Sequence, residues 1–115
     1  MDERRAHPRF ACAFEARVSL ETGETLDGQA VDISFAGICM HIDRPLNPGS
    51  GVRFELWIDP PDRDTSLTLV GRVVWSTPVE GTHQLGATFD RDMDNHSWAR
   101  LDTLLQVISG TPESP

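Results

Sequence analysis

Apolar and polar side chains alternate along most of the chain with a period of two residues. In the first such segment Cys12, Phe14, Ala16, Val18 and Leu20 share one face of an extended strand, and mostly small or polar residues lie between them. Comparable segments follow, separated by turns rich in Gly, Pro and Asp. The pattern predicts six strands, at residues 12–20, 25–33, 37–42, 52–58, 67–76 and 84–90.

The last apolar segment has the period of a helix. Asp92 or Asp94 is placed to cap the start of this helix, and the helix dipole would favour an acidic first turn. Gly110 followed by Pro112 ends the helix. Six strands and one helix predict a mainly β domain, a small antiparallel barrel or sandwich, with the helix covering an open end or an exposed strand edge. The apolar stripe of this helix consists of Trp98, Leu101, Leu105 and Ile108.

Size and charge narrow the possible functions. A chain of 115 residues forms one domain, and its net charge of −8 argues against general binding of DNA or RNA. Binding of a small anion is still possible, because salt screens the effect of charges that lie more than about 8 Å from the anion. The sequence contains no apolar stretch of membrane-spanning length and no secretory signal. Cys12 and Cys39 are expected to be reduced thiols. We therefore expect a cytoplasmic protein without membrane insertion.

The basic residues are unusual in kind and in place. The chain has ten Arg and no Lys, and Arg4, Arg5 and Arg9 fall within six residues at its start. Guanidinium groups suit phosphate oxygens and stack on planar rings. Because Pro8 disfavours a helix here, we expect an extended arm that becomes ordered on a ligand. A solvated, charged tail is the alternative.

A second polar cluster lies at the end of the second predicted strand. Asp32 and Ser34 are two residues apart, so both are expected on the outer face, while Val31 and Ile33 point into the core. Gly37 would then supply a positive φ or allow a close backbone approach. An ordinary turn, in which Asp and Ser bond to local backbone groups, is the alternative.

Taken together, these two clusters resemble the PilZ domain family, whose members bind cyclic di-GMP. The family pattern is an RxxxR arm followed by [D/N]xSxxG, and this chain has Arg5 and Arg9, then Asp32, Ser34 and Gly37. The resemblance implies a six-stranded antiparallel β-barrel with a C-terminal α-helix. It divides the chain into a flexible ligand-binding arm (1–11), the barrel with its helix (12–110) and a disordered tail (111–115). The resemblance also covers the segments 71–75 and 85–89.

The resemblance gives each residue a chemical role. The Arg side chains would bind phosphates and the O6/N7 edge of guanine or stack on the base, and Asp32 would accept hydrogen bonds from guanine N–H groups. Ser34 would bond the ligand or hold the arm. A basic residue at Arg4, directly before the RxxxR motif, implies two ligand molecules per protein. The expected ligand-binding residues are Arg4, Arg5, Arg9, Asp32, Ser34, Gly37 and Trp75.

The position of Trp75 is ambiguous in the sequence. It shares parity with Leu67, Leu69 and Val73, which places it in the core, but the family often has an aromatic residue near the ligand on this strand. A strand bulge could turn it outward. Core packing and stacking on guanine are both retained as interpretations.

The predicted function is that of a cyclic di-GMP receptor in bacterial second-messenger signalling, acting through contact with an unidentified effector protein. Motility and biofilm formation are the processes that such a receptor is expected to influence. No catalytic or metal-binding constellation and no cofactor motif is found, so we expect no enzyme. The alternatives are a PilZ-like adaptor that acts without nucleotide and a binder of single-stranded nucleic acid, which the acidic composition disfavours.

Overall fold

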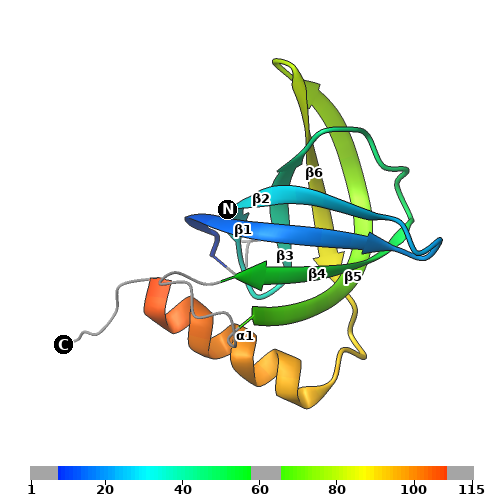
Figure 1. The fold of residues 1–115 in the computed structure, drawn as a ribbon. Helices are drawn as coiled ribbons and strands as arrows, with labels where there is room; N and C mark the ends of the chain where they lie inside the picture. The colour runs from blue at the N-terminus through cyan, green and yellow to red at the C-terminus, as the bar shows by residue number, and fades with distance from the viewer. Residues whose placement is uncertain (1–7, 58–65, 109–115) are drawn as a thin grey trace, which may run out of the picture.

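The elements follow the predicted order (Figure 1). A computed structural model describes residues 8–57 and 66–108. The first strand begins at Phe10, two residues before the prediction, and the last two strands are longer than predicted. The elements are β1 (Phe10–Leu20), β2 (Thr25–Ile33), β3 (Gly37–Ile42), β4 (Gly51–Trp57), β5 (Ser66–Val79), β6 (Thr82–Phe89) and α1 (Asn95–Ile108).

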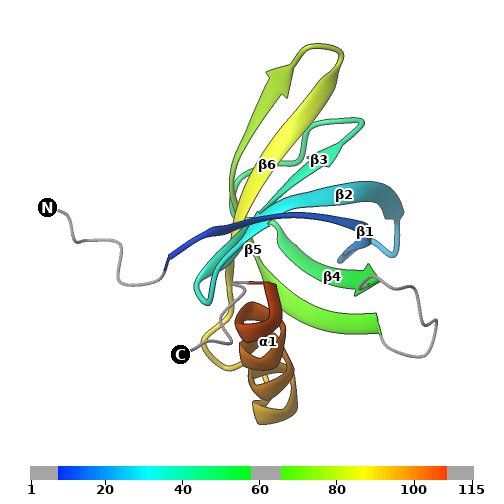
Figure 2. The same ribbon diagram turned by 90° about the vertical axis from the view of Figure 1, so that its left-hand side faces the viewer.

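The six strands close into a single antiparallel barrel in the order β1-β2-β3-β6-β5-β4. Pairing of β1 with β4 completes the closure and sets Glu15 opposite Trp57 and Leu20 opposite Val52. Of the two predicted folds, the barrel is therefore confirmed and the sandwich is excluded. Each described strand has two neighbours, so of the two expected places for the helix the exposed strand edge is wrong. The other, an open end of the barrel, is confirmed, because α1 lies against one end (Figures 1 and 2).

The alternating pattern correctly identifies the inward face of most strands. In β1, Phe14, Ala16 and Val18 are buried while Glu15 and Arg17 are exposed. The second strand departs from the prediction, because Ala30 is fully buried and Val31 only half-buried. The largest fully buried side chains are Phe54, Ile33, Met40, Leu56, Leu67, Leu69, Leu85, Leu101 and Val18.

The helix is capped by Asp94, one of the two predicted candidates. Its carboxylate accepts a hydrogen bond from the backbone N–H of Ser97 at 3.0 Å. The predicted acidic first turn is absent, because the helix begins at Asn95, after the acidic residues. Its buried face consists of Leu101, Leu104 and Leu105.

A two-residue turn joins β5 to β6. The predicted strands leave residues 77–83 between them, but pairing continues to Val79 and Thr82. Only Glu80 and Gly81 lie between the strands, and both have positive φ, 41° and 88°. The resulting hairpin extends beyond the barrel (Figure 2). Its base is the part of β5 that forms one wall of the candidate site.

Candidate functional site

The segment between β2 and β3 is a turn held by the hydroxyl of Ser34. Its Oγ accepts hydrogen bonds from the backbone N–H groups of Ala36 at 3.0 Å and Gly37 at 3.2 Å. The N–H of Ser34 in turn donates to the carbonyl of Gly37 at 2.9 Å. The expected outward position of Ser34 is wrong: the residue is only 4% exposed, because its hydroxyl is turned inward to satisfy these donors.

Gly37 is needed for a close approach between two strands. A Cβ at this position would clash with the backbone carbonyl oxygen of Ala87 on β6 and would lie 3.2 Å from the carbonyl carbon. Its φ is not positive, so of the two reasons considered from the sequence only the close approach applies. The turn therefore lies directly beside β6.

Asp32 occupies the end of β2 after an irregularity in the strand. The register between β2 and β3 shifts by one residue between Ala30 and Asp32, and the bulged residue is Val31. Asp32 then lies opposite Ala11 on β1 and Cys39 on β3. It is half-buried and forms no hydrogen bond or ion pair with the residues the structure describes. No residue of the described part of the chain therefore occupies its carboxylate, which can accept a hydrogen bond.

Two cysteines lie near this carboxylate. Burial, and secondarily the charge of Asp32, raises the pKa of both Cys12 and Cys39 to about 11. Both are free cysteines, as the sequence predicts. At neutral pH they are protonated and add no negative charge to the site.

Trp75 lies on the outer face, because β5 contains the bulge considered from the sequence. Val73 pairs with Ala87, but Trp75 rather than Val74 pairs with Gly86, so Val74 is the extra residue. The alternation that points Leu67, Leu69 and Val73 into the core is therefore interrupted at Val74. Trp75 is 38% exposed and Val74 51% exposed, so the core interpretation of Trp75 is wrong.

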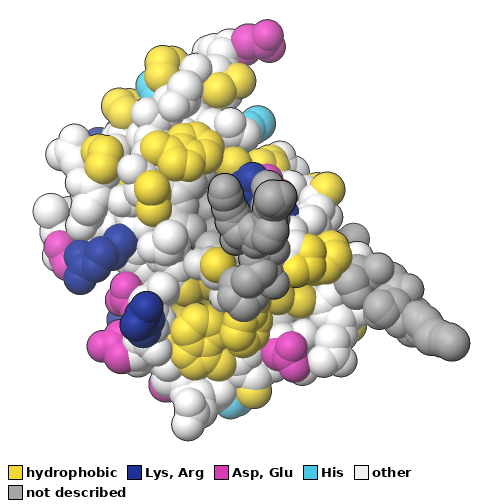
Figure 3. Space-filling view, turned by 180° about the vertical axis from the view of Figure 1, so that it is seen from behind, with side chains coloured by type: hydrophobic (Ala, Val, Ile, Leu, Met, Phe, Trp, Pro, Cys, Tyr) yellow, Lys and Arg dark blue, Asp and Glu magenta, His cyan; other side chains and the backbone are white. Residues whose placement is uncertain are grey.

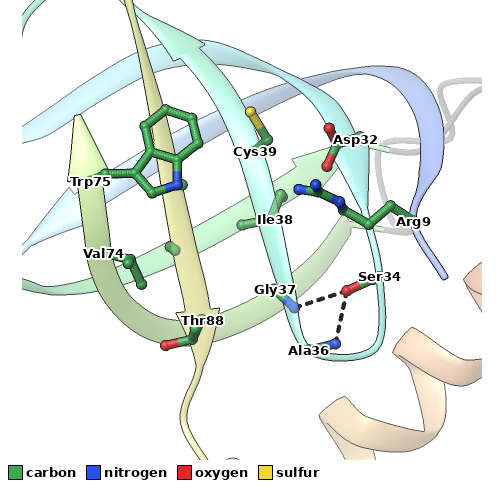
Figure 4. Close-up of a pocket in the computed structure, with 12 residues that line it drawn as sticks. Arg9, Asp32, Ser34, Ala36, Gly37, Ile38, Cys39, Val74, Trp75 and Thr88 are labelled. Atoms are coloured by element: carbon green, nitrogen blue, oxygen red, sulfur yellow. Dashed lines mark hydrogen bonds between the residues drawn. The ribbon is translucent and has the colours of Figure 1, made fainter. Parts of the chain in front are cut away.

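Arg9 lies immediately before β1 and is exposed. Its guanidinium points toward the region between Asp32 and Ile38 (Figure 4) and forms no hydrogen bond or ion pair with described residues. Arg4 and Arg5 lie outside the described residues. Of the predicted arginine cluster, only Arg9 is therefore placed.

These residues line one open pocket of about 280 Å³, between the turn after β2 and the outer face of β5 (Figure 4). Five predicted residues meet here: Arg9, Asp32, Ser34, Gly37 and Trp75. Further lining residues were not predicted, because they come together through the pairing of β3 with β6, which the alternation within each strand does not reveal. The missed lining residues are Ala36, Ile38, Cys39, Val74, Gly86, Ala87 and Thr88.

In the view from behind, apolar side chains gather over the hairpin and near the helix, and acidic side chains lie mainly at the margins of the part not drawn in grey (Figure 3). Arg9 and Asp32, neither of which is paired with a residue of 8–57 or 66–108, both line the pocket. An anionic ligand with aromatic rings is therefore compatible with this face despite the net charge of −8.

Within residues 8–57 and 66–108 no group of three His, Cys, Asp or Glu side chains is placed to hold a metal ion. The same part of the chain includes no helix long and apolar enough to cross a membrane.

Comparison with known proteins identifies the fold and the family. The PilZ domain of YcgR from Escherichia coli, solved with c-di-GMP, superimposes with a TM-score of 0.75 at 14% identity, covering 93% of this chain and 92% of that one. The PilZ domain of CeSA from a cellulose synthesizing bacterium gives 0.63 at 17% identity, covering 90% and 96%.

The K. pneumonia MrkH–c-di-GMP complex gives a TM-score of 0.73 at 20% identity, covering 95% of this chain but only 54% of MrkH. No curated protein sequence matches the chain. The family model of the PilZ domain matches residues 3–106. The matched residues include both sequence motifs and every strand and most of the helix, and the chain therefore belongs to the PilZ domain family.

Proposed function

We propose that this chain is a receptor for cyclic di-GMP. The observation that carries the proposal is the convergence of Arg9, Asp32 and Trp75 on one pocket from three separate segments of the chain. The structurally similar PilZ domain of YcgR and the protein MrkH were both solved with c-di-GMP. Their low sequence identity supports the fold alone, so the binding proposal depends on the residues of this pocket.

The pocket offers a group for each part of such a ligand. A guanidinium can bind a phosphate or the O6/N7 edge of guanine with two hydrogen bonds, and Arg9 has no hydrogen-bond or ion-pair partner among the described residues. The carboxylate of Asp32, which likewise has no described partner, is an acceptor for the N1–H and N2–H donors of guanine. The exposed ring of Trp75 offers a surface on which a base stacks.

The remaining motif residues act in two ways in this proposal. Ser34 and Gly37 fix the turn beside β6, so they shape the pocket floor rather than reach far into it. Arg4 and Arg5, in the arm that precedes β1, supply further cations for the phosphates. Two ligand molecules per protein, as implied by Arg4, is part of the proposal, and a titration that saturates at one equivalent would contradict that part.

Binding would order the arm over the pocket and create a new surface, which an effector protein recognises. This makes the protein a signalling module that binds without catalysing a reaction. An adaptor that acts without nucleotide is disfavoured, because Arg9 and Asp32 line one pocket and neither has a partner among the described residues.

Calorimetric titration with cyclic di-GMP tests the proposal. A hydrogen bond to a charged group contributes roughly 1.5–3 kcal/mol, so Arg9→Ala should weaken binding about ten- to a hundred-fold. Arg53→Ala is the matched control, since it removes the same charge from an exposed position on β4 outside the pocket. Wild-type protein that gives neither heat nor a change in tryptophan fluorescence at micromolar ligand would refute the proposal.

A further inference from the structure

The indole of Trp75 lies directly over a residue without a side chain. Trp75 pairs with Gly86 across β5 and β6. A Cβ built on Gly86 would lie 2.7 Å from Cζ2 of the indole and still closer to Cε2 and Nε1. In Figure 4 the ring lies flat in front of β6. One face of the indole therefore rests against the backbone of β6, and 38% of the residue remains exposed.

Gly86 differs in this respect from other glycines of the barrel. At Gly28, Gly37 and Gly71, the atom nearest to an added Cβ is a backbone carbonyl oxygen of the neighbouring strand. At Gly86 the three nearest atoms all belong to the ring of Trp75. The missing side chain at position 86 therefore makes room for the indole, and not for another strand.

We infer that Gly86 is a positioning residue of the ligand site, which seats the indole of Trp75 flat on the sheet so that its free face can stack on a purine base. The inference rests on the proposed function, because a base is the ligand group that needs such a platform. Any side chain at position 86 would lift the ring off β6 and tilt it into the pocket or out of it.

The bulge in β5 completes this arrangement. Without the extra residue Val74, the parity of Leu69 and Val73 would carry Trp75 into the core. With it, Trp75 and Val74 both face outward and both line the pocket. The bulge thus brings the ring to the outer face, and Gly86 determines how close to the sheet the ring lies.

Titration of cyclic di-GMP into wild type, Gly86→Ala, Trp75→Ala and the double variant tests the inference. Stacking of one base corresponds to roughly five- to a hundred-fold in affinity, so each single variant should lose at least about five-fold. The double variant should bind no more weakly than Trp75→Ala, because Gly86 acts through the ring. Gln84→Ala, the next outward residue on β6 and outside the pocket, should bind like wild type.

A second readout needs no ligand. The indole N–H resonance of Trp75, assigned by its loss in Trp75→Ala, should shift in Gly86→Ala while the melting temperature changes little, because the added methyl meets a side chain that can rotate.

The outcomes separate the two proposals. Wild type that binds while Gly86→Ala binds equally well overturns the inference and leaves the proposed function intact. An equal loss from Gly86→Ala in the Trp75→Ala background also overturns it, since Gly86 would then act by another route. If wild type does not bind, the proposed function fails, and an unshifted indole resonance independently overturns the seating of Trp75 by Gly86.

Discussion

Replacing Ser34 by Ala should destabilise the whole barrel, although the residue lies at the candidate site. Its Oγ accepts two backbone hydrogen bonds, from Ala36 at 3.0 Å and Gly37 at 3.2 Å. Alanine removes the acceptor and leaves both N–H groups without their partner. The turn that they hold connects β2 to β3 and packs beside β6, where Phe89 N–H donates to the carbonyl of Ala36 at 3.0 Å.

The size of the effect follows from the number of bonds lost. A neutral hydrogen bond contributes roughly 0.5–1.5 kcal/mol net, so two bonds give a loss of about 1–3 kcal/mol in the free energy of unfolding. The value should fall in the lower half of this range, because Ala36 is exposed and water can satisfy its N–H. Each kcal/mol corresponds to roughly 4–8 °C in the melting temperature of a small domain.

Urea denaturation monitored by circular dichroism measures this loss. The transition midpoint should fall while the slope stays unchanged, since the surface exposed on unfolding is the same. Ser50→Ala is the matched control: its hydroxyl donates to the carbonyl of Asn47 at 2.7 Å in an exposed loop, so its removal should change stability by less than about 0.5 kcal/mol. A Ser34→Ala midpoint equal to wild type would show that the hydroxyl does not hold the turn.

Two further predictions concern the same fold. Gly37→Ala should lower the free energy of unfolding by about 1–3 kcal/mol, since its methyl meets the carbonyl of Ala87 rather than a movable side chain, and a urea midpoint equal to wild type would contradict this. Asp94 caps α1, and hydrogen bonds from the Ser97 side chain and then its N–H lower the pKa of the Asp94 carboxyl. Because its folded pKa lies below the unfolded one, the stability it contributes is present above the unfolded pKa of about 3.9 and is lost as pH falls through the folded pKa. Asp94→Ala should therefore melt below wild type at neutral pH, and the difference should shrink under acid; a difference independent of pH would refute the role of the charge.

Much of the fold could be read from the spacing of apolar residues. Alternation such as Phe14, Ala16 and Val18 identifies the inward face because successive side chains of a strand point to opposite sides, and the helical stripe through Leu101 and Leu105 identifies the buried face of α1. The motif residues Asp32 and Gly37 were also found, because their side-chain types suggest chemistry or close backbone packing independently of the tertiary structure.

The errors in assigning residues to the inner or outer face occur where the strands are irregular or end. Val31 and Val74 are bulged residues, and a bulge reverses the parity of everything after it without leaving a mark in the local composition. The sequence therefore did not decide whether Trp75 lies in the core or on the surface. Ser34 was predicted to face outward, although its hydroxyl is buried in the turn.

The sequence by itself determined that six strands and a helix form, which faces are buried, and which residues carry charge and hydrogen-bonding groups suited to a nucleotide. Only the tertiary structure decided that Trp75 faces outward and rests on Gly86, because that contact depends on the register between β5 and β6. Register is a property of two strands at once, so neither strand's own sequence specifies it. The pocket between Arg9 and Trp75 exists only once the barrel has closed.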